Sequence, residues 1–517
     1  MSDGPLTTMS DPDALRLVKE LDGLPLALAT AGAYLDQTAT SFSDYLRLYK
    51  ASWAKLLRTS PELSSYEDRA LYSTWQLSFD HIKRRNELSA KLLRLWAYFD
   101  NQDIWFELLQ HSDSEDPEWI RELTEDELIF NGAVRVLSDH GLVEVDTSTQ
   151  ERTESRGYSI HSCVHSWMVY VLNQEWDYDL ARLALKFVGS HVPGKKSAKW
   201  WMTQRRLLQH AARCSHAVLN GMVTDDGMEW ELHRLGNLYA DQGKLHDAEM
   251  MYQWALQGYE KACGPDHIST LDTVNNLALL YANQGKLDEA ERMYQRALQV
   301  KEKAWGPDHV STLNTVNNLG LLYADQGKLD EAEKMYQWAL QGYEEAWGPD
   351  HTSTLDTVNN LGLLYADQGK LDKAEKMYQR ALQGYEKSGG PDHTSTLSTV
   401  NNLGLLYADQ GKLDKAEKMY QRALQGKEKA WGPDHTSTLD TVNNLGNLYK
   451  SQGKLDEAEK MYQRALQGYE KALGLKDVTR YRPALNTIWN LAESLATQGH
   501  LDKVKEMYLR ACASRFS

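Results

Sequence analysis

Residues 355–396 read LDTVNNLGLLYADQGKLDKAEKMYQRALQGYEKSGGPDHTST, and residues 397–438 repeat this stretch with four changes. The differing pairs are Asp356/Ser398, Tyr385/Lys427, Ser388/Ala430 and Gly389/Trp431. A Gly-Pro-Asp-His box marks each copy and recurs every 42 residues, at Gly264, Gly306, Gly348, Gly390 and Gly432. A fixed period of this size predicts a solenoid in which each copy forms one layer.

Each copy contains two stretches with helical periodicity. Apolar residues recur at the spacing of one helix face within 358–365 and again within 374–382. Gly369 lies between the stretches and suits a left-handed helix cap, whereas Pro391 cannot continue the second helix. We therefore expect each copy to be a helical hairpin that buries its apolar face against its neighbours.

The spacing of small and apolar residues in one copy resembles that of the tetratricopeptide family. The residues that carry the resemblance are Leu361, Gly362, Tyr365, Gly369, Ala374, Tyr378 and Ala381. The 42-residue length and the VNNLGLLYADQGK segment are similar to the kinesin light chain variety. The expected fold class is therefore all-α, a superhelical solenoid of about seven hairpins across residues 229–517, counted from Leu235, Leu277, Leu319, Leu361, Leu403, Leu445 and Leu491.

Composition restricts the partners and the compartment. The formal net charge of the 517 residues is -16, which disfavours nucleic acid and anionic membranes as partners. The four cysteines show no paired spacing, as expected in a reducing compartment. No apolar run is long enough to span a membrane. We expect a cytoplasmic protein without nucleic-acid or membrane partners.

The N-terminal segment, residues 1–65, contains VKELDGLPLALATAGAYL at positions 18–35. This stretch resembles the GLPLA motif of the NB-ARC module of signalling ATPases, which implies an ARC-like helical segment. In that family the motif lies against the nucleotide, so the resemblance makes Pro25 a candidate nucleotide contact. A helix-turn-helix corner that needs Gly and Pro is a sufficient explanation on its own.

Residues 66–175 resemble the winged-helix subdomain that follows in the same family. Residues 142–145 and 158–160 alternate as two short strands, which we expect to form the wing. His161 matches the histidine of the family's Met-His-Asp motif, which contacts the diphosphate, but its flanking residues do not match. A histidine that only packs is the alternative. Cys163 and His165 suggest a metal site with His161, but no fourth ligand is evident, so we expect no metal.

The chain lacks the phosphate-binding loop of the family, because no G-x-x-x-x-G-K-[ST] segment occurs. The sequence therefore predicts the C-terminal part of a fungal-type NB-ARC/tetratricopeptide, NLR-like protein without its nucleotide-binding domain. No cofactor is expected, and ADP or ATP would bind only if such a domain precedes the chain. Residues 176–228 are expected to be connecting helices.

The groove of the array is the expected binding surface. Paired asparagines recur on the first helix of successive copies, and carboxylates follow about two turns further on. The candidate groove residues are Asn275, Asn276, Asn317, Asn318, Asn359, Asn360, Asn401, Asn402, Asn443, Asn444, Asp325, Asp367 and Asp409. Amides bond peptide backbone, and carboxylates favour a basic ligand. The amides could instead bond the neighbouring helix.

Two positions of the second helix vary within the otherwise constant frame. One position reads Trp254/Arg296/Trp338/Arg380, and the other reads Tyr259/Lys301/Tyr343/Tyr385/Lys427. We expect these positions to form a surface on which partner choice is adjusted, although neutral drift at a surface would look the same.

The sequence thus predicts a non-catalytic scaffold that binds an extended, possibly basic peptide or a partner protein, as the sensor part of an NLR-like receptor. One alternative is a fragment of an ATP/ADP-switched signalling NTPase. Another is a kinesin-light-chain-like cargo adaptor.

Overall fold

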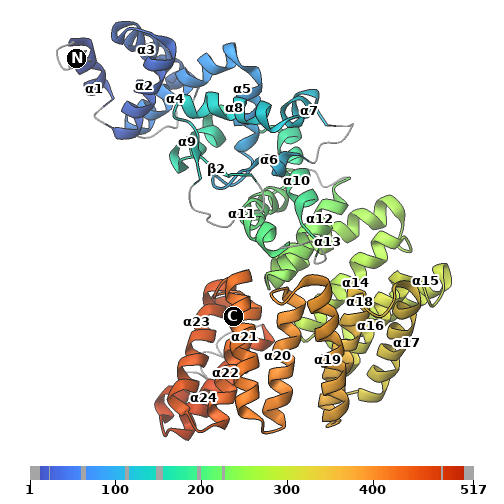
Figure 1. Ribbon diagram of the computed structural model, residues 1–517. Helices are drawn as coiled ribbons and strands as arrows, with labels where there is room; N and C mark the ends of the chain where they lie inside the picture. The colour runs from blue at the N-terminus through green and yellow to red at the C-terminus, as the bar shows by residue number, and fades with distance from the viewer. Residues whose placement is uncertain are drawn as a thin grey trace. The chain divides into compact units, whose positions relative to one another are not determined.

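The computed structural model describes residues 12–21, 24–59, 66–110, 116–146, 155–194, 200–223, 227–478 and 481–505 (Figure 1). The chain divides into two compact units. The first contains residues 1–191 and 206–224, and the second contains residues 192–205 and 225–517. The finer boundaries expected at 65 and 175 stay predictions.

The first unit is helical apart from one pair of short strands. Its elements are α1 (Pro12–Glu20), α2 (Pro25–Thr38), α3 (Phe42–Thr59), α4 (Tyr66–Arg85), α5 (Glu87–Trp96), α6 (Phe106–Leu109), α7 (Glu118–Thr124), α8 (Glu127–Asp139), β1 (Glu144–Val145), β2 (Tyr158–Ser159), α9 (Ser162–Trp167), the π-helical turn η2 (Met168–Leu172), α10 (Tyr178–His191) and α11 (Trp200–Leu219), whose first turns belong to the second unit.

The strands β1 and β2 are antiparallel, with Glu144 opposite Ser159 and Val145 opposite Tyr158. The expected β-hairpin is therefore present, and most of its connecting loop, residues 147–154, lies outside the described residues. Tyr158 stacks on Trp96, which is fully buried, so the strand pair is anchored to the aromatic core of this unit.

The second unit is the solenoid expected from the repeats. Its helices are α12 (Glu229–Asp241), α13 (Leu245–Cys263), α14 (Ile268–Asn283), α15 (Leu287–Trp305), α16 (Val310–Asp325), α17 (Leu329–Trp347), α18 (Thr352–Asp367), α19 (Leu371–Gly389), α20 (Thr394–Asp409), α21 (Leu413–Trp431), α22 (Thr436–Ser451), α23 (Leu455–Val478) and α24 (Arg482–Thr497). In Figure 1 they run from green to red. Helices α12–α23 form six hairpins, and α24 begins the seventh.

One hairpin, α18 with α19, shows why these residues fold as they do. Val358 and Leu361 on α18 and Tyr378 on α19 are buried in the hairpin and its neighbours. Gly369 has a φ of +71°, the left-handed conformation that the tight turn requires. Gly384 has no room for a side chain, because an added Cβ would lie 2.5 Å from Leu355 Cδ2. The glycines at the same position of other copies, Gly342, Gly426 and Gly468, have the same close approach to a leucine of the first helix, so this glycine permits close packing of the two helices.

The Gly-Pro-Asp-His box separates one hairpin from the next. The His351 side chain accepts a hydrogen bond from the Ser353 backbone N–H and caps α18. The Thr354 hydroxyl donates to the Gly348 carbonyl at 2.9 Å. The box therefore works as a cap and a chain reversal, as its residues predict.

Neighbouring hairpins are tied by a ladder of polar contacts at their turns. The Gln368 side-chain amide donates to Glu333 at 3.3 Å, and the Tyr365 hydroxyl donates to the same carboxylate at 3.1 Å. Lys370 lies over the Tyr365 ring, 5.5 Å from its centroid. Each rung joins only adjacent copies, which is the energetic pattern of a solenoid.

Contacts within the second unit also join copies that are far apart in sequence. A Cβ built on Gly243, in the turn of the first hairpin, would lie 2.9 Å from Thr436 Cγ2 at the start of α22. The Arg482 guanidinium lies 3.7 Å from the Asp325 carboxylate, and the rings of Trp200 and Trp431 lie 6.3 Å apart. The array therefore curves until its early and late hairpins meet around a shared interior.

Candidate functional site

A cavity of about 580 Å³ lies inside this curve. Every first helix from α12 to α24 contributes to its wall. Polar groups from copies far apart in sequence therefore face one space. The polar side chains of the wall include Asp241, Asp325, Asp356, Asn359, Ser398, Ser437, Asp440 and Arg482.

The wall is acidic. Four aspartates, at 241, 325, 356 and 440, line it, and Arg482 is the one lysine or arginine among the described lining residues. Burial raises the pKa of Asp325, and the nearby Arg482 partly offsets this effect. The four aspartates and the single arginine leave this wall with more acidic than basic side chains.

The expected carboxylate series continues along the array beyond the cavity. Burial raises the pKa of Asp367, and the charges of Asp325 and Asp409 add to this effect. Burial also raises the pKa of Asp409. Of these three candidates only Asp325 is among the residues that line the cavity. Asp367 and Asp409 form an exposed acidic column instead.

The asparagine pairs connect successive first helices. The Asn359 side-chain oxygen accepts from Thr399 Oγ1 at 3.1 Å and from Asn402 Nδ2 at 3.3 Å in the next copy. The same pattern recurs at Asn317 with Thr357, and at Asn443 with Thr487 and Asn490. These asparagine side chains therefore bond the neighbouring helix, which was the alternative to binding a ligand.

Most candidate amides lie outside the cavity wall. Asn359 is the one candidate amide among the residues that line the cavity, and Asn275 is only 6% exposed. A role of the amides in binding stays a proposal.

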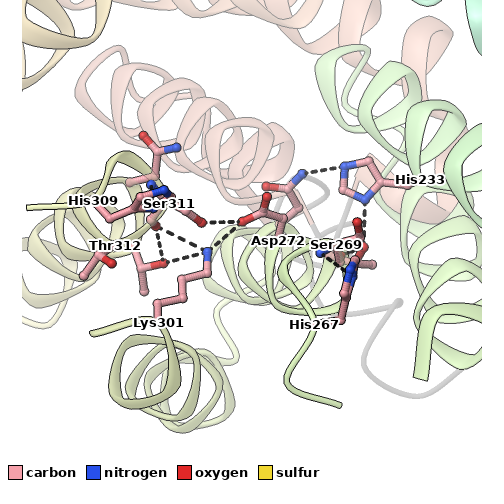
Figure 2. A network of polar contacts seen from close by, with 12 residues as sticks. His233, His267, Ser269, Asp272, Lys301, His309, Ser311 and Thr312 are labelled. Carbon is pink, nitrogen blue, oxygen red and sulfur yellow. Dashed lines mark hydrogen bonds and ion pairs between the residues drawn. The ribbon is translucent and has the colours of Figure 1, made fainter. Parts of the chain in front are cut away.

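The first hairpin replaces the leading asparagine by His233. Its Nδ1 lies 2.9 Å from Thr273 Oγ1, and its Nε2 lies 3.4 Å from Asn276 Nδ2 (Figure 2). Burial lowers the pKa of His233 to about 4, despite the nearby Asp272. The neutral imidazole thus continues the amide ladder at this end of the array.

One of the two variable positions of the second helix does not form a surface. Lys301, Tyr343, Tyr385 and Lys427 are at most 3% exposed. The expectation of an exposed surface at this position is therefore wrong for these four residues, because each of their long side chains lies between helices and bonds polar groups there. The other variable position lies on the second helices, where Arg380 pairs with Glu344 of the preceding copy at 2.5 Å.

The buried position on the second helix is paired with a position on the first helix of the same copy. The Tyr385 hydroxyl donates to Asp356, and the Tyr343 hydroxyl donates to Asn314 at 2.5 Å. Lys301 donates to Asp272 at 2.7 Å. The two positions are 29 residues apart in each case. Asp356 and Tyr385 both line the cavity, so the pair decides part of its chemistry.

The two candidate nucleotide contacts lie in the first unit. Pro25 is exposed at the first position of α2, and Gly23 of the motif lies outside the described residues. The exposed His161 caps α9 by accepting from the Cys163 backbone N–H at 3.3 Å, and it borders a hollow of about 380 Å³ next to β1 and β2. Pro25 does not line this hollow. A shared nucleotide site therefore stays a prediction from resemblance.

Within the described part of the chain, no cluster of three or more His, Cys, Asp or Glu side chains could hold a metal ion. Over the same residues, no helix is both long and apolar enough to cross a membrane.

The chain matches the tetratricopeptide repeat model at residues 230–303, 270–345, 353–429 and 398–471, so residues 230–471 are tetratricopeptide repeats apart from a gap of seven residues. It is 31% identical over 284 residues to a nucleotide-binding leucine-rich repeat (NLR)-like protein from Hyaloscypha variabilis. That match covers 51% of this chain and 26% of the relative, so the chain spans about a quarter of that protein's length.

Solved structures with similar folds include two from signalling and repeat proteins. A putative kinesin light chain with nearly identical TPR-like repeats from Podosopora anserina is 21% identical, with 40% of this chain and 97% of that chain covered and a TM-score of 0.33. A STAND protein with a tetratricopeptide repeat sensor from Pyrococcus horikoshii is 16% identical, with 96% and 67% covered and a TM-score of 0.42.

Proposed function

We propose that the array binds an extended peptide, or an extended segment of a partner protein, in the cavity and along the first helices. The observation that carries this proposal is the acidic cavity, in which the first helices of seven copies present polar groups to one space. A solenoid with such an interior supports binding.

The spacing of the copies sets the length of the ligand. Packed helices lie about 10 Å apart, which equals about three extended residues, so contact with three copies requires about nine residues. Each backbone hydrogen bond would contribute about 1 kcal/mol net. The carboxylates at 241, 325, 356 and 440 favour a ligand that carries Lys or Arg, with an affinity that weakens as salt is added.

The similarity to an NLR-like protein supports a role as the sensor part of a signalling receptor. In that arrangement the ligand would act on a nucleotide-driven switch elsewhere in the receptor. A kinesin-light-chain-like adaptor is the second candidate, and the 42-residue repeat with its VNNLGLLYADQGK segment is the observation that favours it.

A peptide-display selection on the full chain tests this proposal. We expect enrichment of peptides with two or more basic residues, and weaker binding by the variants Asp325→Asn and Asn359→Ala. Arg380→Ala is the matched control, because Arg380 pairs with Glu344 and does not line the cavity. Enrichment of acidic peptides would refute the charge argument. Full binding by both cavity variants, with loss in the control, would place the site on the second helices.

A further inference from the structure

Two nearly identical copies differ in both members of one buried pair. Residues 355–396 carry Asp356 with Tyr385, whereas residues 397–438 carry Ser398 with Lys427. These two differences are half of the four that separate the copies. Because the positions form a bonded pair in the first copy, the joint change points to one altered local chemistry.

A third copy shows how lysine is accommodated at this position. The Lys301 ammonium donates to Asp272 Oδ1 at 2.7 Å, and the Ser311 hydroxyl donates to the same oxygen at 2.8 Å (Figure 2). Lys301 also donates to the Ser311 carbonyl and to Thr315 Oγ1. The Asp272 side chain is 47% exposed, so this carboxylate lies where solvent reaches it.

Lys427 has the same surroundings without the carboxylate. It is 3% exposed and donates to the Ser437 carbonyl at 3.1 Å and to Thr441 Oγ1 at 3.0 Å, the counterparts of Ser311 and Thr315. The counterpart of Asp272 is Ser398, whose side chain is too short to supply a carboxylate. Among the described hydrogen bonds and ion pairs, Lys427 therefore has neutral oxygen acceptors only.

The negative charge that acts on Lys427 belongs to Asp440 of the following copy. Burial lowers the pKa of Lys427 to about 8, and Asp440 partly offsets this effect. Asp440 itself accepts a hydrogen bond from Tyr469, and burial raises the pKa of Asp440. Asp440 thus balances the ammonium incompletely, and a buried cation without a bonded counter-charge is costly.

Ser398 and Ser437 both line the cavity, so the place that a carboxylate occupies beside Lys301 is open to a ligand beside Lys427. We propose that this place is an anion subsite, in which a ligand carboxylate accepts hydrogen bonds from Lys427 Nζ and Ser437 Oγ. The subsite does not depend on the rest of the ligand being a peptide. In a peptide, the group would be the C-terminal carboxylate or an Asp or Glu side chain.

The subsite makes the expected order of charges along the ligand more specific. Along the wall, Asp356 and Asp440 flank Ser398 in neighbouring copies. A fitting ligand therefore carries one carboxylate between cationic groups, at intervals of about three extended residues.

Acetate is the probe for the subsite, compared with chloride at equal ionic strength. At ten times its dissociation constant, acetate should raise the ratio of folded to unfolded protein about eleven-fold by mass action. The variant Ser398→Asp should remove this response, because its own carboxylate fills the subsite as Asp272 does in the other copy. The variant Asp272→Ser should add a second acetate response, since it opens the equivalent place beside Lys301.

A direct readout is the pKa of Lys427, followed by nuclear magnetic resonance of labelled lysine side chains. Acetate should raise this pKa in the wild type, and Ser398→Asp should raise it without acetate. If Ser398→Asp does not fold, the double variant Ser398→Asp/Lys427→Tyr restores the pair found in residues 355–396 and should be insensitive to acetate. An unchanged Lys427 pKa in acetate, or an equal acetate response in the double variant, would overturn the proposal.

Peptides from the display selection then distinguish the source of the carboxylate. If the C-terminal carboxylate occupies the subsite, amidation should weaken binding at least ten-fold in the wild type and have no effect in Ser398→Asp. If a side chain occupies it, replacement of Asp or Glu in the peptide should have that effect instead. If neither amidation nor replacement of Asp or Glu weakens binding, and acetate has no effect, the subsite is refuted. The proposal that peptides bind in the cavity would still stand.

Discussion

Residues 355–396 and 397–438 are the most informative regions to compare, because they share 38 of 42 residues and the same hairpin. In one, an aspartate accepts a hydrogen bond from a tyrosine. In the other, a serine takes the place of that aspartate in the sequence, and a buried lysine donates to the Ser437 carbonyl and to Thr441 Oγ1. The shared residues form the helices, turns and caps. The differing pair changes the charge of the cavity wall while the packing stays the same.

The comparison shows that the buried apolar residues, which form the fold, can stay the same while the polar residues of the cavity wall change. Val358 and Val400 are both fully buried, as are Ala381 and Ala423, so the apolar frame of the two copies is the same. The site residues lie on the same helices but at positions where the chain tolerates different polar pairs. Exchanging these pairs between copies should therefore alter recognition with little cost in stability.

The largest effect should come from removing one copy. Deleting residues 355–396 in frame should leave helicity per residue unchanged by circular dichroism, because each copy contacts its neighbours through the same residues. Binding of a selected peptide should be lost in calorimetry, since the deletion removes Asp356 and Asn359 from the cavity wall. It also removes one hairpin between Asp325 and Arg482, so these two side chains should no longer pair. Unchanged affinity in the shortened chain would contradict a site inside the curve.

A smaller effect, on the free energy of unfolding, should distinguish the Asp356–Tyr385 pair from the Ser398–Lys427 pair. Asp356→Ala leaves the buried Tyr385 hydroxyl without its acceptor and should cost about 1–3 kcal/mol of unfolding free energy in urea titrations. Ser398→Ala removes only a hydroxyl at the cavity wall and should cost about 0.5 kcal/mol or less. Asp356→Asn keeps an acceptor and serves as the control. Equal costs for the two alanine variants would mean that the pairs are not distinct.

The pH dependence of stability should distinguish residues 397–438, which carry Lys427, from residues 355–396 at alkaline pH. The pKa of Lys427 is about 8 in the folded chain and about 10.4 when unfolded, so the unfolded chain binds more protons between these values. Stability due to Lys427 should therefore rise as pH increases from 8 to 10. In thermal melts, Ser398→Asp/Lys427→Tyr should lack this rise relative to the wild type. A rise of the same size in the double variant would refute the assignment.

The first hairpin offers a parallel test at acidic pH, because it carries His233 where the compared copies carry Asn359 and Asn401. The pKa of His233 is about 4 in the folded chain and about 6.5 when unfolded. The stability that the neutral histidine supplies is complete above pH 6.5 and is lost as pH falls toward 4. As pH is lowered from 6.5 to 4, the melting temperature of His233→Asn should fall less than that of the wild type. Identical pH profiles would show that His233 is not buried as described.

The smallest effect should come from the acidic column. The raised pKa of Asp367 and of Asp409 means that each carboxylate destabilises the folded chain above its folded pKa. Asp367 also faces two like charges, so Asp367→Asn should stabilise the chain at pH 7 by about 0.5 kcal/mol, and Asp409→Asn by less, because exposure screens both. The same variants should bind a basic peptide more weakly. Destabilisation by Asp367→Asn would contradict the repulsion.

Much of the fold could be predicted from the sequence. The 42-residue period gives the hairpin and the number of copies, and Gly369 and His351 give the turn and the cap, because these depend on neighbouring residues only. The meeting of Gly243 with Thr436 could not be predicted. It depends on the small rotation between copies, which accumulates over five hairpins and leaves no pattern in any single copy.

Asp325 and Asn359, two of the groove residues expected from the sequence, line the cavity, and their role in binding stays a prediction. Lys427 was assigned to a surface because its position varies within an otherwise constant frame, whereas the structure buries it. The sequence did hold a signal for the buried pair. Residues 29 apart change together between two copies that differ at only two other positions, which indicates contact.

Hydrogen–deuterium exchange of the full chain, with and without a basic peptide from the selection, tests the location of binding most directly. Binding in the cavity predicts slower exchange at the starts of α20, α22 and α24, near Ser398, Asp440 and Arg482, which line the cavity together. Exchange around Glu344 and Arg380 on the second helices should not change. Protection confined to those second helices, with none at Ser398, Asp440 or Arg482, would contradict the account.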